Sequence, residues 1–75
     1  MDRNEDEMAF LVVIEKANGN FSAYSPDVSG CVSTGKTREE CAENMREAFR
    51  LHLEELRRDG EPLPESRSTA EYVNL

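Results

Sequence analysis

The chain has 75 residues, with 9 Lys and Arg against 16 Asp and Glu, which gives a formal net charge of −7. This length allows one domain, and so small a domain usually needs support from disulfides, a metal or a partner subunit. The acidic balance argues against direct nucleic-acid binding, which depends on cations that neutralise phosphates. It agrees with attraction toward a basic partner, and equally with solubility alone.

The first seven residues are almost wholly polar. We expect a disordered acidic N-terminus over residues 1–7 and one domain over residues 8–75. The start lacks the apolar core of a signal peptide, and the apolar run at residues 9–14 is far shorter than the roughly 20 residues that span a membrane. We therefore expect a cytoplasmic protein without membrane contact.

The chain holds two cysteines and a single histidine. Cys31 and Cys41 have no second cysteine pair and no histidine at ligand spacing, so we expect reduced, packed thiols, no metal and no cofactor. His52 falls within the apolar periodicity of a predicted helix. It is interpreted as a packed or interface histidine, with a catalytic base as the alternative.

Residues Met8–Glu15 are rich in β-branched and aromatic side chains, which predicts a strand. Both of its faces are apolar, so the strand is expected to be covered on two sides. The single predicted helix can cover one side only, which favours association with a second subunit or a partner. The faces are Met8, Phe10, Val12 and Ile14 on one side, and Ala9, Leu11 and Val13 on the other.

Turn residues separate the next predicted strands. Asn18-Gly19 is a strong hairpin signal before a return strand at Phe21–Ser25. The cluster Pro26–Gly30 predicts a turn into a third strand at Cys31–Thr34. Tyr72–Leu75 is predicted as a short last strand.

A capping box of Thr37 and Glu40 predicts the start of a long helix, in which each residue bonds the backbone N–H of the other. Gly60 is the expected residue just beyond its end. The helix has one apolar face, formed by Cys41, Met45, Ala48, Phe49, His52, Leu53 and Leu56. We therefore predict an α+β domain of order β-β-β-α-β: a three-stranded antiparallel meander, one long helix packed on it, and a short fourth strand.

No combination of nucleophile, base, carboxylate pair or metal cluster is evident, so we do not expect an enzyme. Asp27 follows a proline in a turn, where aspartate commonly bonds its own backbone. Glu43 and Glu47 lie three residues before Arg46 and Arg50, which predicts ion pairs on the solvent side of the helix.

Residues 24–49 carry a specific pattern: a strand ending in Pro26-Asp27, then Gly30-Cys31, then Gly35-x-Thr37-x-Glu39-Glu40 at the start of a helix. This pattern resembles the HicB-like antitoxin family. The resemblance implies a partial RNase H-like fold, with the fourth strand beside the first. It also implies dimers or tetramers, and a partner that is a small basic mRNA-cleaving ribonuclease of the HicA-like toxin class.

The leading hypothesis is therefore an antitoxin-like binding module that neutralises such a toxin in a type II toxin-antitoxin system. The alternatives are a stand-alone oligomeric regulatory or scaffold domain with no toxin partner and, last, an enzyme. Many relatives carry a C-terminal DNA-binding domain, which we do not expect in this chain. The residues predicted to bind the partner are Asp27, Ser29, Cys31, Glu43 and Glu47.

Overall fold

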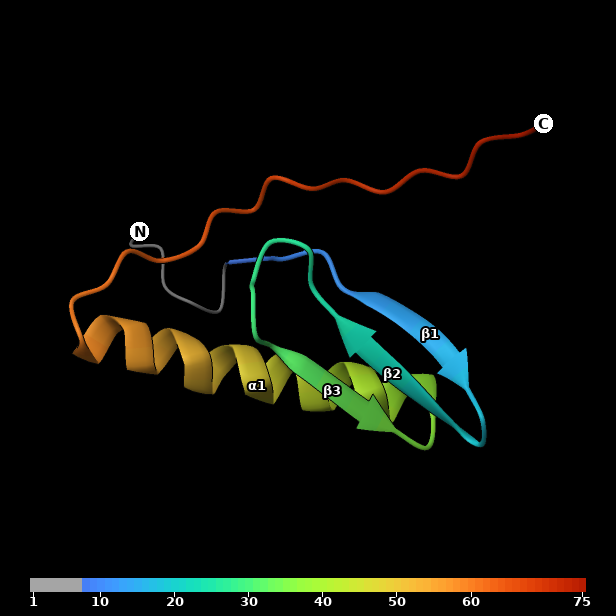
Figure 1. Cartoon of the computed structure of the whole chain (residues 1–75), viewed down its shortest axis with the longest axis horizontal. Coiled ribbons are helices and arrows are strands. Elements are labelled where there is room, and N and C mark those ends of the chain that lie inside the picture. The colour runs from blue at the N-terminus through green and yellow to red at the C-terminus, as the bar shows by residue number, and fades with distance from the viewer. Residues whose placement is uncertain (1–7) are drawn as a thin grey trace.

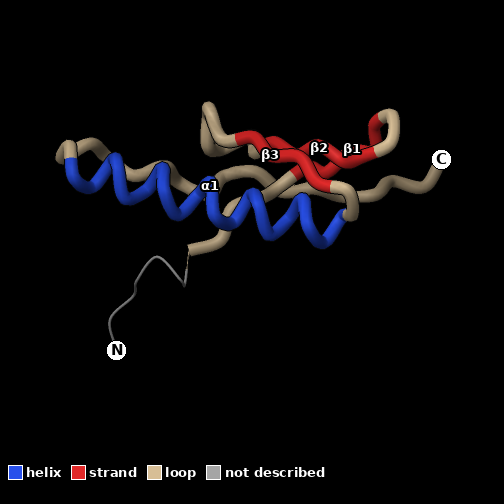
Figure 2. Tube along the Cα trace, turned by 90° about the horizontal axis from the view of Figure 1, so that it is seen from below, coloured by secondary structure: helices blue, strands red, loops and turns tan. Residues whose placement is uncertain are grey.

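The computed structural model describes residues 8–75, so the prediction of a disordered acidic segment at residues 1–7 lies outside the described residues. Three strands form an antiparallel sheet of order β1-β2-β3, and one long helix, α1, packs across one face of it (Figures 1 and 2). The predicted α+β meander with one helix is confirmed. The elements are β1 (Val13–Ala17), β2 (Asn20–Tyr24), β3 (Val32–Gly35) and α1 (Arg38–Arg58).

The first hairpin forms at the predicted Asn18-Gly19 turn. Gly19 has a φ of 76°, a left-handed conformation that glycine adopts without a Cβ clash. Ala17 pairs with Asn20 at the turn, and the ladder continues to Val13 opposite Tyr24. The turn therefore fixes a register in which Ile14 lies beside Ala23 on the face that meets the helix.

The first strand is shorter at its start than predicted and begins at Val13, not Met8. Its neighbour β2 ends at Tyr24, and Pro26 soon afterwards has no backbone N–H to donate to a ladder. Residues 8–12 therefore enter no ladder in the described part of the chain.

Both predicted ends of α1 are confirmed. The Glu40 N–H donates to the Thr37 hydroxyl at 3.0 Å, while the Glu40 carboxylate accepts from Lys36, one residue earlier than the capping box predicted. At the other end Gly60 has a φ of 71°. The N–H groups of Gly60 and Glu61 bond the last-turn carbonyls at 3.1 and 2.8 Å, an arrangement that closes the helix.

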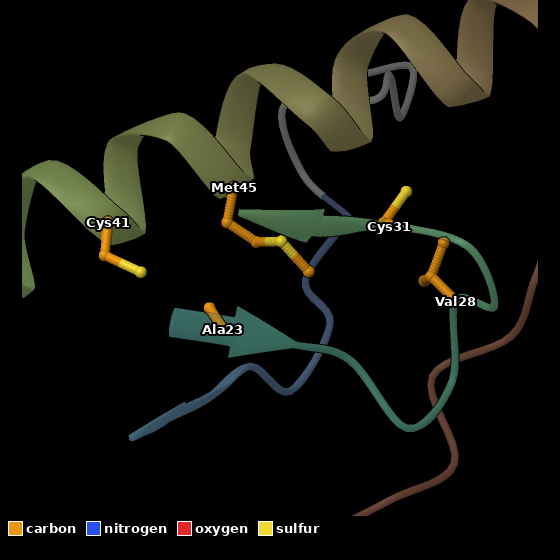
Figure 3. Close-up of a cluster of buried hydrophobic side chains, with 5 residues drawn as sticks. All are labelled: Ala23, Val28, Cys31, Cys41 and Met45. Carbon is orange, nitrogen blue, oxygen red and sulfur yellow. The ribbon is translucent and has the colours of Figure 1, made fainter. Parts of the chain in front are cut away.

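The core lies between α1 and the sheet and is small (Figure 3). The predicted inner face of the first strand is confirmed where Phe10, Val12 and Ile14 pack against it, and the Phe10 and Phe49 rings lie 5.4 Å apart. Both cysteines are free and buried, as predicted. The core residues are Ala23, Val28, Cys31, Cys41 and Met45.

After α1 the chain turns back and runs as an extended segment on the β1 side of the sheet, ending clear of it (Figure 1). The strand predicted at Tyr72–Leu75 is not formed in the described chain, where the sheet holds β1, β2 and β3. Residues 67 and 68 are held at the β2–β3 loop. Beyond them the segment diverges from the sheet, so its backbone meets no strand to pair with.

Candidate partner-binding surface

The five predicted binding residues occupy two regions of the structure. Asp27, Ser29 and Cys31 lie in or beside the loop that joins β2 to β3. Glu43 and Glu47 lie on α1, about 200° around the helix from the buried Cys41 and Met45, and therefore face away from the sheet. Two of the three loop residues are engaged inside the molecule.

Asp27 binds the C-terminal segment and not its own turn, in contrast to the local bond that its sequence context predicted. Its carboxylate accepts three hydrogen bonds of 2.8 Å, from the Arg67 N–H, the Ser68 N–H and the Ser68 hydroxyl. The two backbone donors, with the Ser68 hydroxyl, hold the pKa of Asp27 below its ordinary value of 3.8. A charged Asp27 therefore fastens residues 67 and 68 to the β2–β3 loop.

Cys31 is buried, and its thiol lies 3.8 Å from the Ala48 carbonyl of α1. Burial raises the pKa of this thiol, because the thiolate would lose its water. Ser29, two residues earlier, is exposed. Of the loop residues, Ser29 is thus accessible at the surface, while the side chains of Asp27 and Cys31 are engaged inside the molecule.

The outward face of α1 carries both predicted ion pairs. Glu43 lies 3.4 Å from Arg46, and Glu47 lies 3.2 Å from Arg50, all at exposed positions. Pairs of this kind contribute little to stability, so the carboxylates can change partner at small cost. Leu51 lies one turn beyond Glu47 on the same face and is 57% exposed. Leu51 was not among the predicted binding residues, although its position outside the apolar periodicity marks it as an outward residue.

A second exposed apolar group lies on the sheet face opposite α1. The ladder places Val13, Tyr24 and Val32 in one row across the three strands. Tyr24 is 46% exposed and Val32 is 68% exposed. This row follows from the alternation of side chains along strands, but only the register shows that the three residues are neighbours.

A hollow with a volume of about 330 Å³ lies between the unpaired residues 8–12 and α1. Apolar side chains line it, including Phe10, Phe49 and Leu53, with Arg46 and Arg50 at the helix side. Among residues 8–75, no three His, Cys, Asp or Glu side chains come together to hold a metal. No helix in that range is long and apolar enough to cross a membrane.

Residues 10–75 match the sequence profile of the HicB-like antitoxins of bacterial toxin-antitoxin systems. The chain belongs to the HicB-like antitoxin family. A chain of the solved HicA3 and HicB3 toxin-antitoxin complex has a similar structure, with a TM-score of 0.62 and 34% sequence identity. That match covers 77% of this HicB-like chain and 72% of the solved chain.

Relatives of this HicB-like chain occur in a phage, a bacterium and an archaeon. It is 39% identical over 67 residues to an uncharacterized 14.9 kDa protein of Haemophilus phage HP1, covering 89% of its own length but half of the phage protein. It is 42% identical to a UPF0150 protein of Helicobacter pylori, covering 69% of this chain and 72% of the relative. A UPF0150 protein of Thermoplasma acidophilum is 33% identical, and the match covers 91% of this chain and 97% of the relative.

Proposed function

We propose that this HicB-like chain is a non-catalytic antitoxin module of the cytoplasm that neutralises a small, basic, mRNA-cleaving toxin of the HicA class. The match to a chain of a toxin-antitoxin complex carries the proposal. The proposal includes the partial RNase H-like fold, in which a fourth strand joins the sheet, and self-association of the domain. Direct binding to nucleic acid is not part of it.

The charge of the chain supports a basic partner. A formal net charge of −7 on 75 residues attracts a cationic protein over a distance and raises the rate of encounter. The same charge repels RNA, so the antitoxin does not compete with the toxin for its substrate. Salt screens such attraction, so binding should weaken as ionic strength rises.

We assign the contact to the outward face of α1, with Ser29 of the neighbouring loop as a further contact. Glu43 and Glu47 are exposed carboxylates that can leave Arg46 and Arg50 for a basic partner. Leu51 supplies apolar area beside them. An interface of this kind gains most from the apolar residue, while the charges direct the approach.

The test is binding of the full chain to a purified HicA-like toxin by titration calorimetry, together with protection of mRNA from cleavage. Replacing both Glu43 and Glu47 by Gln should weaken binding and flatten its salt dependence. The matched control replaces Glu54 and Glu55, which are exposed on the same helix, by Gln. No binding of the unaltered chain at low salt would overturn the proposal. If the two double variants weakened binding equally, the contact would not lie at Glu43 and Glu47.

The alternative function is a stand-alone oligomeric regulatory or scaffold domain without a toxin partner. The row of Val13, Tyr24 and Val32 favours it, since Tyr24 and Val32 are exposed and an apolar sheet face needs no charged partner. Under this alternative the chain self-associates but protects no mRNA in the cleavage assay. Replacing Val32 by Asp would then break the assembly, while Thr34→Asp in the adjacent polar row would not.

A further inference from the structure

The hollow between residues 8–12 and α1 is left open by two small side chains. Ala9 on the extended segment and Ala42 on α1 both line it, and an alanine side chain ends at Cβ. The volume of about 330 Å³ lies at the lower end of the range of roughly 300–1,000 Å³ that is typical of small-molecule sites. The hollow therefore has room for a small ligand and is too small for a folded domain.

One wall of the hollow is a single stripe of α1. The stripe consists of Arg46, Phe49, Arg50 and Leu53, which lie three or four positions apart and so share one side of the helix. Leu53 is buried, and the Phe49 ring packs 5.4 Å from the Phe10 ring, whereas both arginines are exposed. The hollow thus has an apolar floor and a cationic rim.

Each arginine at the rim already meets a carboxylate. Arg46 Nε lies 3.4 Å from Glu43, and Arg50 Nη1 lies 3.2 Å from Glu47. Both pairs are exposed and such pairs contribute little to stability, so a ligand carboxylate can replace a glutamate at small cost. A guanidinium offers five N–H donors in a planar fork that matches a carboxylate. The two glutamates stay close and repel a ligand that carries more than one negative charge.

We propose that this hollow binds a small molecule with an apolar body and one carboxylate. The apolar body lies against Phe10, Phe49 and Leu53, where leaving water supplies most of the affinity. The carboxylate accepts hydrogen bonds from Arg46 and Arg50 at the rim. This inference goes beyond the proposed function and needs no toxin, so either proposal can fail while the other stands.

A preference for anions separates this site from the general field of the protein. The chain has a formal net charge of −7, so its overall field attracts small cations and repels small anions. Octanoate and octylammonium share one apolar chain and differ in the charge of the head group. Because the local arginines favour only the carboxylate, octanoate should bind at least about tenfold more tightly, the effect of one charge-assisted hydrogen bond.

Nuclear magnetic resonance titration of the full chain with each of the two compounds tests the site. Octanoate should shift the signals of Phe10, Phe49 and Leu53 and the Nε–H signals of both rim arginines, and the shifts should saturate. No saturable shift at these residues, or equally tight binding of octylammonium, would overturn the proposal. Shifts of the same signals when the ligand-free chain is diluted would show that a second copy covers the hollow, and would also overturn it.

Two arginine variants test the role of the rim. Arg50→Gln should weaken octanoate binding roughly tenfold, because it removes a charged donor, and should not weaken octylammonium binding. The matched control is Arg58→Gln, at an exposed position on the same helix and outside the lining of the hollow. Octanoate binding to this control should stay within about twofold of the parent, as for an ordinary surface substitution. Both variants should keep the helical circular dichroism of the parent, and equal weakening of octanoate in the two would overturn the proposal.

Discussion

Asp27 and Ser68 are joined by two hydrogen bonds of 2.8 Å although they lie 41 residues apart in the chain. The contact ties the loop after β2 to the segment that follows α1, and so closes the domain around its small core. Val28, which follows Asp27 directly, and Cys31, at the end of the same loop, are both buried core residues. The contact therefore positions the C-terminal segment relative to the rest of the fold.

Replacing Asp27 by Asn should release this segment. The amide is uncharged and offers one acceptor oxygen instead of two, so it cannot hold all three donors as the carboxylate does. We expect faster cleavage by a broad-specificity protease between residues 62 and 75, with α1 still intact. Glu15→Gln is the control for loss of a surface charge, and cleavage as slow in Asp27→Asn as in this control would contradict the prediction.

The same contact should depend on pH. Its hydrogen bonds to the charged carboxylate hold the pKa of Asp27 below the ordinary value of 3.8. The stabilisation is therefore fully present above that ordinary value and is lost as the pH falls through the lowered pKa of the folded state. Hydrogen exchange of the Arg67 and Ser68 amides, corrected for intrinsic rates, should stay protected at pH 5 and lose protection in stronger acid. In the Asp27→Asn variant the protection of these two amides against exchange should be lower at pH 5. It should not change further as the pH falls through the range in which Asp27 titrates.

Gly35 should tolerate no side chain. A Cβ at this position would lie 2.5 Å from the Cys41 backbone nitrogen and 2.8 Å from the Cys41 Cα, and backbone atoms cannot move aside as a flexible side chain can. Gly35→Ala should therefore lower the free energy of unfolding by about 1–3 kcal/mol, as overpacking does. Equilibrium unfolding in urea measures this change in the free energy of unfolding. Thr34→Ala at the neighbouring exposed position should cost clearly less, and similar midpoints for the two variants would contradict the close contact.

The two thiols should react slowly in the folded protein. Both cysteines are buried, and burial raises the pKa of Cys31, so its reactive thiolate is scarce at neutral pH. A colorimetric thiol reagent should modify the native chain far more slowly than the chain in denaturant. Ser29→Cys, at an exposed loop position, should add one rapidly reacting thiol. Rapid reaction of the unaltered chain would show that the core around Cys31 opens readily.

Much of the domain follows from local sequence. The Asn18-Gly19 hairpin and both ends of α1 were predicted correctly, because each depends on residues a few positions apart. The start of β1 was placed five residues too early. Its composition favours a strand from Met8, but a strand also needs a neighbour, and β2 ends where Tyr24 meets Val13.

The candidate binding residues were predicted less completely. Glu43 and Glu47 were predicted on the solvent side of α1 from their spacing, and their ion pairs were found there. The exposure of Leu51 and the hollow beside residues 8–12 were not predicted. Both depend on how α1 lies over the sheet, which the periodicity of one helix does not fix.

The sequence by itself determined the helix, its caps, the first turn and the family pattern of residues 24–49, because these features are set by steric and hydrogen-bonding preferences of neighbouring residues. Only the tertiary structure decided the partner of Asp27 and the residue at which the first strand starts. A carboxylate accepts hydrogen bonds from any donor that the fold brings near. Its choice of Ser68 depends on the path of the chain around α1, which no local preference records.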